Sequence, residues 1–450
     1  MEKKMKRFTL ISMISLSCLT PAIGSEAGAI FLLISPGARA GGMGEANVAV
    51  ADDAYASYWN PAGLGFLEGS ELAMMHVNWL PNLADDLYYD FFAFRKHVPT
   101  LGTFGGHLIY LSLGEQIRMG EGPDDYLGTF TSFMMATTVS YSSLLSANSS
   151  FGINAKISYQ HLVDLGAGAE KGKGTSLDFG FDLGYLRKGF LTPDLDVGLA
   201  ITNIGPKVSF IDPAQADPQP TNLSLGLNYR VVDSEFNKFS LIYDVNKLLV
   251  SSYPDMDWDG DGIIGGCDEE GHCTNIPHSG DYNSDGDRET AHTDPVYIAL
   301  FTSWVDDWLL GGDTDFSGDG VIGGYNAEGF HTPLDSISFG EPGYGRYGCE
   351  EESGDICSEE NLVLEVGTGD SRTIKNEFDK LVHNFGMEYW YSEYFALRAG
   401  YYLDQSGKIS NPTFGVGLRF AGYGFDFGYT SGEPGHPLTN TMRFSLNWEF

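Results

Sequence analysis

Apolar and polar residues alternate most regularly at the C-terminal end of the chain. From Met442 to Phe450, every even-numbered residue is apolar and every odd-numbered residue is polar. Successive side chains of a β-strand point to opposite faces, so this period of two predicts a strand with one apolar and one polar face. Phe450 places a final aromatic side chain on the apolar face.

The same alternation recurs in residues 151–160, 177–185, 223–229, 414–420 and 423–429. The second face of these segments consists of Gly, Ser, Asn and single charged residues, among them Asp178, Asp182 and Asp426. A soluble β-sandwich would give the same local pattern, so periodicity alone does not identify a membrane barrel. The number of residues available for strands favours the barrel. Roughly 270 residues outside the N-terminal and acidic regions, at about ten residues per strand plus a turn, provide about fourteen strands.

We therefore predict an all-β fold, a transmembrane antiparallel β-barrel of about fourteen strands. Its aromatic face would meet lipid, and its polar face would line the lumen. The composition agrees, because 58 Gly, 13% aromatic and only 19% charged residues suit short pleated strands. After the N-terminus, no segment approaches the roughly 20 apolar residues that a spanning helix needs.

The N-terminal region has a different pattern. A basic stub and an apolar stretch are followed by small residues, which is the layout of a secretory signal peptide. We predict that residues 1–24 are this signal, that the Gly- and Ala-rich residues 25–68 form a hatch, and that residues 69–450 form the barrel. Acidic insertions interrupt the barrel at about residues 251–294 and 311–374.

The formal net charge of the chain is −35. Nucleic-acid binding is therefore not expected, because phosphates require a basic surface. The acidic residues are concentrated between Asp255 and Glu377, which indicates exposed loops rather than membrane strands. We expect no enzymatic activity, since the ten histidines are scattered and the sequence has neither a Gly-x-Ser-x-Gly motif nor a phosphate-binding loop.

Several motifs occur in the order typical of one protein family. The chain contains SPGARAGGMG at residues 35–44, VAVADD at 48–53 and WNPAGL at 59–64. With further segments at residues 79–83, 110–115, 244–250, 388–391, 395–401 and 437–446, they resemble the PorV/PorQ family of FadL-like outer-membrane barrels. The element Asn60-Pro61-Ala62 is similar to the hatch signature of that wider group.

The resemblance implies a fourteen-stranded barrel in the cell outer membrane with an N-terminal hatch. It also implies a role in type IX secretion, in which the protein binds the C-terminal sorting domains of secreted cargo. The cargo would pass from the translocon to the cell-surface attachment complex, so both complexes and outer-membrane lipid are expected partners. The alternative function is that of a FadL-like transporter for hydrophobic small molecules, which rests only on shared architecture and the hatch.

Two Asp- and Gly-rich segments of the acidic insertions have the spacing of calcium-binding loops. The ligands expected in the first loop are Asp257, Asp259, Asp261 and Asp268. The ligands expected in the second loop are Asp315, Ser317, Asp319 and Asn326. Calcium takes several oxygen ligands at short range, which alternate residues of a tight turn supply. The alternative is a solvated Asp/Gly turn, and we expect no cofactor besides calcium.

Four cysteines follow the signal segment as two close pairs, Cys267 with Cys273 and Cys349 with Cys357. Exported loops permit disulfide bonds, and the even number of cysteines fits two local bridges. Zinc binding is the alternative, but neither pair has histidines at the spacing of a metal site. We therefore favour the disulfides.

Overall fold

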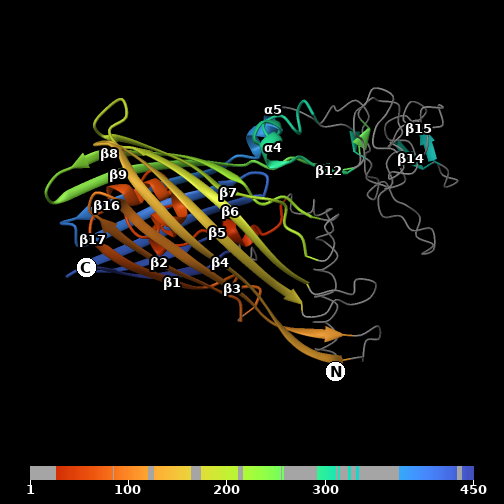
Figure 1. The fold of residues 1–450 in the computed structure, drawn as a ribbon, viewed down its shortest axis with the longest axis horizontal. Coiled ribbons are helices and arrows are strands. Elements are labelled where there is room, and N and C mark those ends of the chain that lie inside the picture. Colours follow the sequence, from red (N-terminus) through yellow and green to blue (C-terminus); the bar gives the residue numbers. More distant parts are fainter. Residues whose placement is uncertain are drawn as a thin grey trace.

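The computed structural model describes residues 27–84, 86–119, 126–163, 174–210, 216–254, 256–257, 291–310, 313–314, 323–325, 331–333, 374–432 and 438–450. Fourteen strands in this part of the chain form one closed antiparallel barrel (Figure 1). They are β1 Ser70–Asn78, β2 Tyr88–Val98, β3 Gly102–Met119, β4 Tyr126–Ser146, β5 Ser149–Val163, β6 Gly174–Arg187, β7 Leu195–Ile204, β8 Asn222–Asp233, β9 Asn237–Leu248, β16 Val382–Tyr391, β17 Phe395–Asp404, β18 Ile409–Phe420, β19 Tyr423–Thr430 and β20 Thr441–Glu449. The predicted fold class and strand number are confirmed.

The barrel closes where its first strand meets its last. Strands adjacent in sequence are adjacent in the barrel up to β9, which pairs with β16, and β1 pairs with β20. At this seam the Ser70 amide donates to the Phe450 carbonyl at 3.0 Å, and the Phe450 amide donates to the Ser70 carbonyl at 2.9 Å. Closure leaves no open sheet edge, which a membrane requires because unpaired backbone groups are costly in lipid.

The two ends of the barrel have different connections. The end that holds the C-terminus has tight turns, such as Ala421-Gly422 between β18 and β19, where φ is 52° and 82°. Positive φ at both central residues is the requirement of a type I′ hairpin. The opposite end carries the long connection of residues 249–381 between β9 and β16 (Figure 1). Outer-membrane barrels have short turns on the periplasmic side and long loops outside, so we name these the inner end and the outer end.

The wall is apolar outside and polar inside. On β5, Phe151 and Ile157 are exposed, whereas Asn154 and Lys156 are buried. On β20, likewise, the apolar Phe444 is exposed while Arg443 and Asn447 are buried. Strands β1, β2 and β3 differ, because they also point apolar residues such as Met75, Phe91 and Ile109 inward, where these residues form a hydrophobic cluster with the hatch. The lipid-facing and lumen-facing residues predicted from the alternation are therefore confirmed.

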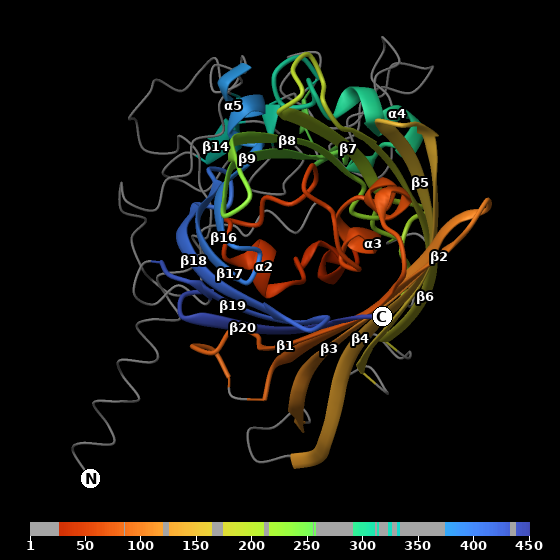
Figure 2. The same cartoon turned by 90° about the vertical axis from the view of Figure 1, so that its left-hand side faces the viewer.

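Residues 27–68, which we call the hatch, lie inside the ring of strands (Figure 2). Their helical pieces are η1 Ile30–Leu33, α2 Ala38–Gly41, α3 Ala56–Trp59 and η2 Pro61–Phe66. Most of the hatch residues are buried, many of them Ala or Gly. Small side chains allow the hatch backbone to approach the wall closely.

At the outer end, the connection between β9 and β16 contains the helices α4 Val296–Thr302 and α5 Ile374–Asp379. Short strands pair in the same connection: β10 Ser252–Tyr253 with β12 His292–Thr293, β11 Met256–Asp257 with β13 Asp313–Thr314, and β14 Gly323–Tyr325 with β15 His331–Pro333. Among the described residues, no helix has the length and apolar character needed to cross a membrane.

Candidate functional site: the hatch and the cavities beside it

Asn60 links two parts of the hatch to the wall. Its side chain is fully buried. The Oδ1 atom accepts from the Ala62 amide at 3.1 Å, and Nδ2 donates to the carbonyls of Val48 at 3.0 Å and Tyr185 at 3.1 Å. Tyr185 belongs to β6, so one amide group fixes the start of η2, a second hatch segment and the wall together. The residues of the predicted hatch motif, Asn60, Pro61 and Ala62, lie at this junction.

Wall glycines make room for this junction. A Cβ atom added at Gly152 of β5 would lie 2.3 Å from the carbonyl carbon of Pro61 and 2.4 Å from the amide nitrogen of Ala62. At Gly184 of β6 it would lie 2.3 Å from Oδ1 of Asn60. These distances are well inside van der Waals contact, so any side chain at either position would displace the hatch backbone.

A second junction fixes the earlier part of the hatch. Asp244 of β9 is fully buried, and its Oδ2 atom accepts from the amides of Asn47 at 2.6 Å and Val48 at 2.8 Å. Nearby, the Gly44 amide donates to Thr413 at 2.8 Å, and its carbonyl accepts from Asn384 at 2.6 Å. Side chains of the wall therefore provide hydrogen-bond partners for backbone groups of the hatch.

A buried chain of charges also joins the hatch to the wall. The Arg39 guanidinium of α2 donates to both carboxylate oxygens of Glu388, each at 2.8 Å, and it also contacts Asp52. Glu388 accepts from Arg398 at 2.8 Å, which in turn lies 2.8 Å from Asp426. Two-point contact between a guanidinium and a carboxylate fixes orientation as well as distance.

Asp53 lies beside this chain of charges, with its Oδ2 atom 3.7 Å from Arg39 Nη1. Burial raises the pKa of Asp53 to about 7, and the nearby charge of Glu71 adds to this rise while Arg39 opposes it.

Other lumen charges are also paired. Lys156 lies 3.1 Å from Asp182, and Arg95 lies 2.7 Å from Glu71. Asp182 and Asp426 were predicted to line the lumen, and both occupy it as partners of basic side chains. Such pairing is the arrangement expected of buried charges that support a structure.

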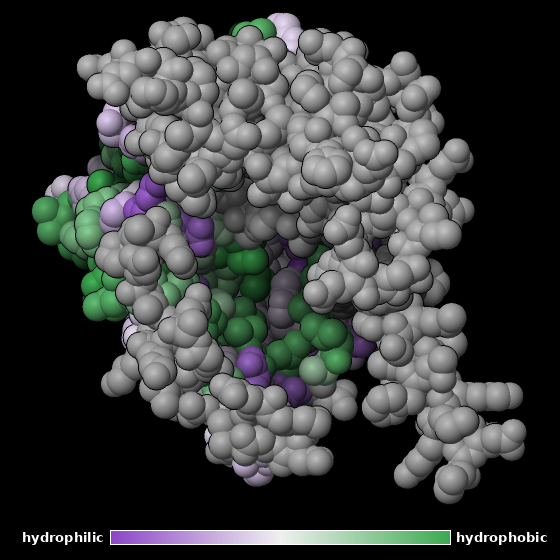
Figure 3. Space-filling model, turned by 90° about the vertical axis from the view of Figure 1, so that its right-hand side faces the viewer, coloured by the Kyte–Doolittle hydropathy of each residue, from purple (hydrophilic) through white to green (hydrophobic). Residues whose placement is uncertain are grey.

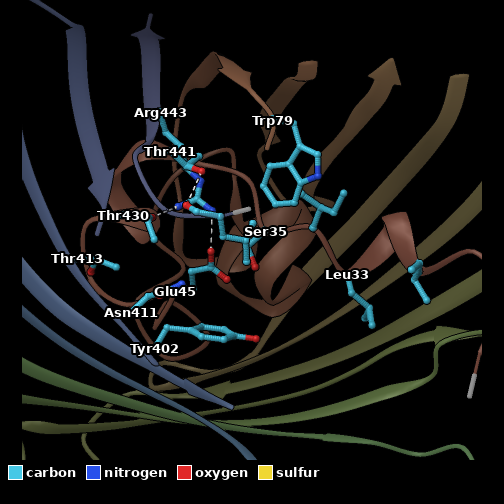
Figure 4. Close-up of a pocket in the computed structure, with 13 residues that line it drawn as sticks. Leu33, Ser35, Glu45, Trp79, Tyr402, Asn411, Thr413, Thr430, Thr441 and Arg443 are labelled. Carbon is cyan, nitrogen blue, oxygen red and sulfur yellow. Dashed lines mark hydrogen bonds and ion pairs between the residues drawn. The ribbon is translucent and has the colours of Figure 1, made fainter. Parts of the chain in front are cut away.

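The outer pocket is a cavity of about 250 Å³ on the outer side of the hatch (Figure 4). Leu33 and Trp79 contribute apolar side chains to it. Its polar side contains Glu45 and Arg443, whose charged groups lie 2.7 Å apart (Figure 4). At the outer end, hydrophobic surface gathers in a hollow (Figure 3), and Ile30 and Leu33 are both exposed there.

The inner cavity, of about 870 Å³, opens at the other side of the hatch. Its lining includes Arg39 and Glu388 from the chain of charges and Glu449 beside the seam. It shares no lining residue with the outer pocket. The hatch therefore separates two cavities that differ in character, one largely apolar and one rich in charge.

The predicted calcium ligands and cysteines lie outside the described residues. This applies to Asp259, Asp261, Asp268, Asp315, Ser317, Asp319, Asn326, Cys267, Cys273, Cys349 and Cys357, while of Asp257 only the backbone pairing with Asp313 is described. In the described part of the chain, no group of three or more His, Cys, Asp or Glu residues is placed to hold a metal ion.

The pair Arg39–Glu388 was not found from the sequence. The two residues are 349 positions apart, and only the register of the closed barrel brings them together. Arg39 did offer one signal, because it is the single charged residue within residues 35–44, a segment otherwise made of small and apolar residues.

Solved structures that are similar to this chain include the toluene transporter TbuX of Ralstonia pickettii. It is 12% identical, with 93% of this chain and 100% of that chain covered and a TM-score of 0.43. The toluene transporter TodX of Pseudomonas putida is also 12% identical, with coverage of 92% and 96% and a TM-score of 0.45. A FadL homologue of Pseudomonas aeruginosa is 9% identical, with coverage of 92% and 98% and a TM-score of 0.36.

A search of curated protein sequences finds no match to this chain. A family model does match: the one described as Type IX secretion system protein PorV covers residues 23–255, just over half of the chain. The matched region contains the whole described hatch and the strands β1 to β9. The chain therefore belongs to the PorV family and is an outer-membrane barrel of the type IX secretion system.

Proposed function

We propose that the protein binds the folded C-terminal sorting domain of secreted cargo at the outer end of the barrel. It receives the cargo as it leaves the translocon and passes it to the attachment complex on the cell surface. The PorV family is a family of secretion components rather than enzymes, which supports a binding role.

The position of the hatch is the observation that carries this proposal. Buried contacts to β5, β6, β9 and β16 hold the hatch inside the lumen. A folded domain therefore has no path through the barrel, and its contacts must lie outside the lumen. The hollow with apolar surface at the outer end offers such a place (Figure 3).

Deleting the protein tests the proposal. Cargo with a sorting domain should then remain in the periplasm or at the translocon, and restoring the parent protein should return it to the cell surface. The measurement is the distribution of one such cargo between periplasm and surface, with an exported protein that lacks the sorting domain as control. Unchanged surface display of the cargo in the deletion strain would contradict the proposal.

A second candidate function is the uptake of hydrophobic small molecules, and the outer pocket favours it. This pocket combines the apolar Leu33 and Trp79 with one charged pair, which suits a small amphipathic molecule. In this case the deletion strain would display cargo normally but take up a long-chain or aromatic nutrient more slowly. The same strain therefore separates the two functions.

We also propose, from the sequence, that calcium binds to the Asp-rich loops that begin at Asp257 and Asp315, and that the cysteine pairs form local disulfides. Calcium at a dissociation constant of about 10⁻⁴–10⁻³ M would suffice outside the cell. Calorimetric titration of the whole protein should give binding heat that Asp257→Ala and Asp261→Ala reduce. The variant Asp233→Ala, at the inner end of β8, should leave the heat unchanged. Equal heats in all four proteins would contradict calcium binding by the first loop.

A further inference from the structure

A segment at the outer end exposes large apolar side chains. Residues 296–310, which include α4, and residues 374–379, which are α5, form what we call the rim segment. Tyr297 is 68% exposed, Phe301 76% and Leu309 57%, and Trp304 and Trp308 are also exposed. Tyr297 and Phe301 lie on α4, and Trp304 and Trp308 lie in the turns that follow it, so the exposed side of the segment is an aromatic stripe.

The opposite stripe of the rim segment is small or polar and buried. Ala299 of α4 and Ser303 and Asp306 after it are 2%, 0% and 6% exposed. Asp306 lies 3.1 Å from Lys380, and the carboxylate of Glu377 accepts from the amides of residues 307 and 308. The segment is therefore apolar outside and polar inside, which is the reverse of a helix that packs on a protein in water.

The rim segment covers the outward face of β9. In the barrel register Lys247 pairs with Leu223, and Leu241 in the same outward row of β9 is 43% exposed. Lys247 nevertheless is only 4% exposed, because its Nζ atom lies 3.6 Å from Glu377 and 5.9 Å from the ring centre of Trp304. Figure 2 shows α4 and α5 outside the ring of strands.

We propose that the aromatic stripe of the rim segment lies in the headgroup region of the outer leaflet. The stripe continues the lipid-facing surface of the wall past the end of β9, because the segment sits on the outward side of that strand. Its residues also fit the position, since Trp and Tyr are the side chains that favour the membrane–water interface.

The inversion of polarity is what points to lipid rather than water. A monomeric protein in water rarely exposes a contiguous surface with two Trp, one Tyr and one Phe. The barrel wall shows the same inversion, with Phe444 outside and Arg443 inside, because lipid surrounds it. A protein partner on the stripe is the competing occupant, and the test below distinguishes it.

Fluorescence quenching in nanodiscs tests the proposal. The protein is placed in phosphatidylcholine nanodiscs whose acyl chains carry bromine near the headgroup, or in the same nanodiscs without bromine. The emission of Trp308 is obtained as the difference between the parent and Trp308→Phe. We expect a loss of this emission in brominated nanodiscs as large as that of Trp448, which is exposed on the outward face of β20.

The emission differences between the parent and two other Trp→Phe variants serve as controls. Trp448→Phe gives the emission of a lipid-facing residue, and Trp59→Phe gives that of a buried hatch residue, which brominated lipid should not quench. If Trp448 is quenched and Trp308 is not, the proposal is wrong.

A photoreactive phenylalanine analogue at position 301 provides a second readout in cells. It should form products with lipid, and products with a protein alone would identify the stripe as a protein interface and overturn the proposal.

Discussion

Arg39 of α2 forms ion pairs with carboxylates of both the hatch and the wall. Its guanidinium lies among the carboxylates of Asp52, Asp53 and Glu388. A buried ion pair adds little net stability, because both charges lose their hydration on folding. Loss of one partner, however, leaves the other charge buried without compensation. The pair therefore determines where the hatch sits more than how stable the barrel is.

We predict that Arg39→Met loosens the hatch and leaves the wall folded. Methionine keeps an unbranched apolar side chain but removes the charge, so the free energy of hatch opening should fall by about 3 kcal/mol. Hydrogen exchange of residues 38–51 should accelerate, while exchange in β5 and β6 should not. The control Lys238→Met removes an exposed pair with Glu393 and should cost less than about 1 kcal/mol. Unchanged hatch exchange in Arg39→Met would contradict the anchoring role.

We predict that acid stabilises the rim segment through Asp306. Burial raises the pKa of Asp306 to about 6, with Glu377 acting in the same direction and Lys380 and Lys247 against it. The folded segment then holds the proton more tightly than the unfolded chain, whose pKa is the ordinary 3.8. Local stability should therefore fall as the pH rises from about 4 to about 6 and stay constant above.

Urea unfolding followed by the emission of Trp304 and Trp308 measures this effect. The midpoint should decrease between pH 4 and pH 6.5 in the parent, and Asp306→Asn should remove most of the decrease. A variant with the pH dependence of the parent would assign the effect to another group.

At the scale of elements, the hatch backbone comes closest to the wall at wall glycines. Gly152 and Gly184 stand where the start of η2 touches β5 and β6, and Gly400 of β17 stands where Gly44 touches the wall. A Cβ atom at Gly400 would lie 2.1 Å from the Gly44 amide nitrogen. At Gly152 and Gly400 the nearest hatch atoms all belong to the backbone, so no flexible side chain can move aside for an added methyl group. At Gly184 the nearest atom is Oδ1 of Asn60.

We predict that Gly152→Ala displaces the motif Asn60-Pro61-Ala62 from its position against β5 and β6. The added methyl would overlap the hatch backbone, and shifts of this kind cost about 1–3 kcal/mol or more. Cleavage of the hatch by an added protease should become faster, with the barrel itself still folded. Gly180→Ala is the matched control, because its methyl would meet the end of the Gln219 side chain at 3.0 Å. Equal cleavage of the two variants would show that the close approach is unimportant.

The strands and the direction in which their side chains point could be predicted from the sequence, because the pattern that reveals them lies within each strand. A period of two in β5, β6, β8, β18, β19 and β20 follows from the lipid on one side of the wall. The pairing of Arg39 with Glu388 could not be predicted, because it depends on the register of strands far apart in the chain.

The sequence contains a pattern that marks the rim segment. Its aromatic residues at 297, 301, 304 and 308 predict a helical stripe. The spacing does not reveal that this stripe faces outward, because an ordinary amphipathic helix has the same pattern with its apolar side toward the protein core.

At the scale of the whole molecule, Phe450 takes part in the seam that closes the barrel. Phe450 forms two backbone hydrogen bonds with Ser70, and its ring lies 4.6 Å from that of Trp448. Trp448 also stacks on Tyr423 at 6.1 Å. Aromatic residues thus gather at the inner interface beside the seam, where outer-membrane barrels carry an aromatic girdle.

We predict that the folded protein shows heat-modifiable migration in SDS gels, because the closed wall resists the detergent until it is heated. Deletion of Phe450 should reduce the folded fraction, since the seam loses both hydrogen bonds to Ser70. Phe450→Tyr keeps the backbone and an aromatic ring and should behave as the parent. Identical migration of heated and unheated parent, or recovery of the parent in the soluble fraction, would contradict a membrane barrel.

The contacts of the hatch with distant strands have a consequence for the order of assembly. The hatch is bonded to β6 through Asn60 and to β16 through Arg39, and the seam joins β1 to β20 around it. The ring of strands surrounds the hatch on all sides, so we expect the hatch to dock on the wall before the seam between β1 and β20 forms. We therefore expect capture of the hatch and pairing of β20 with β1 to be a single kinetic event.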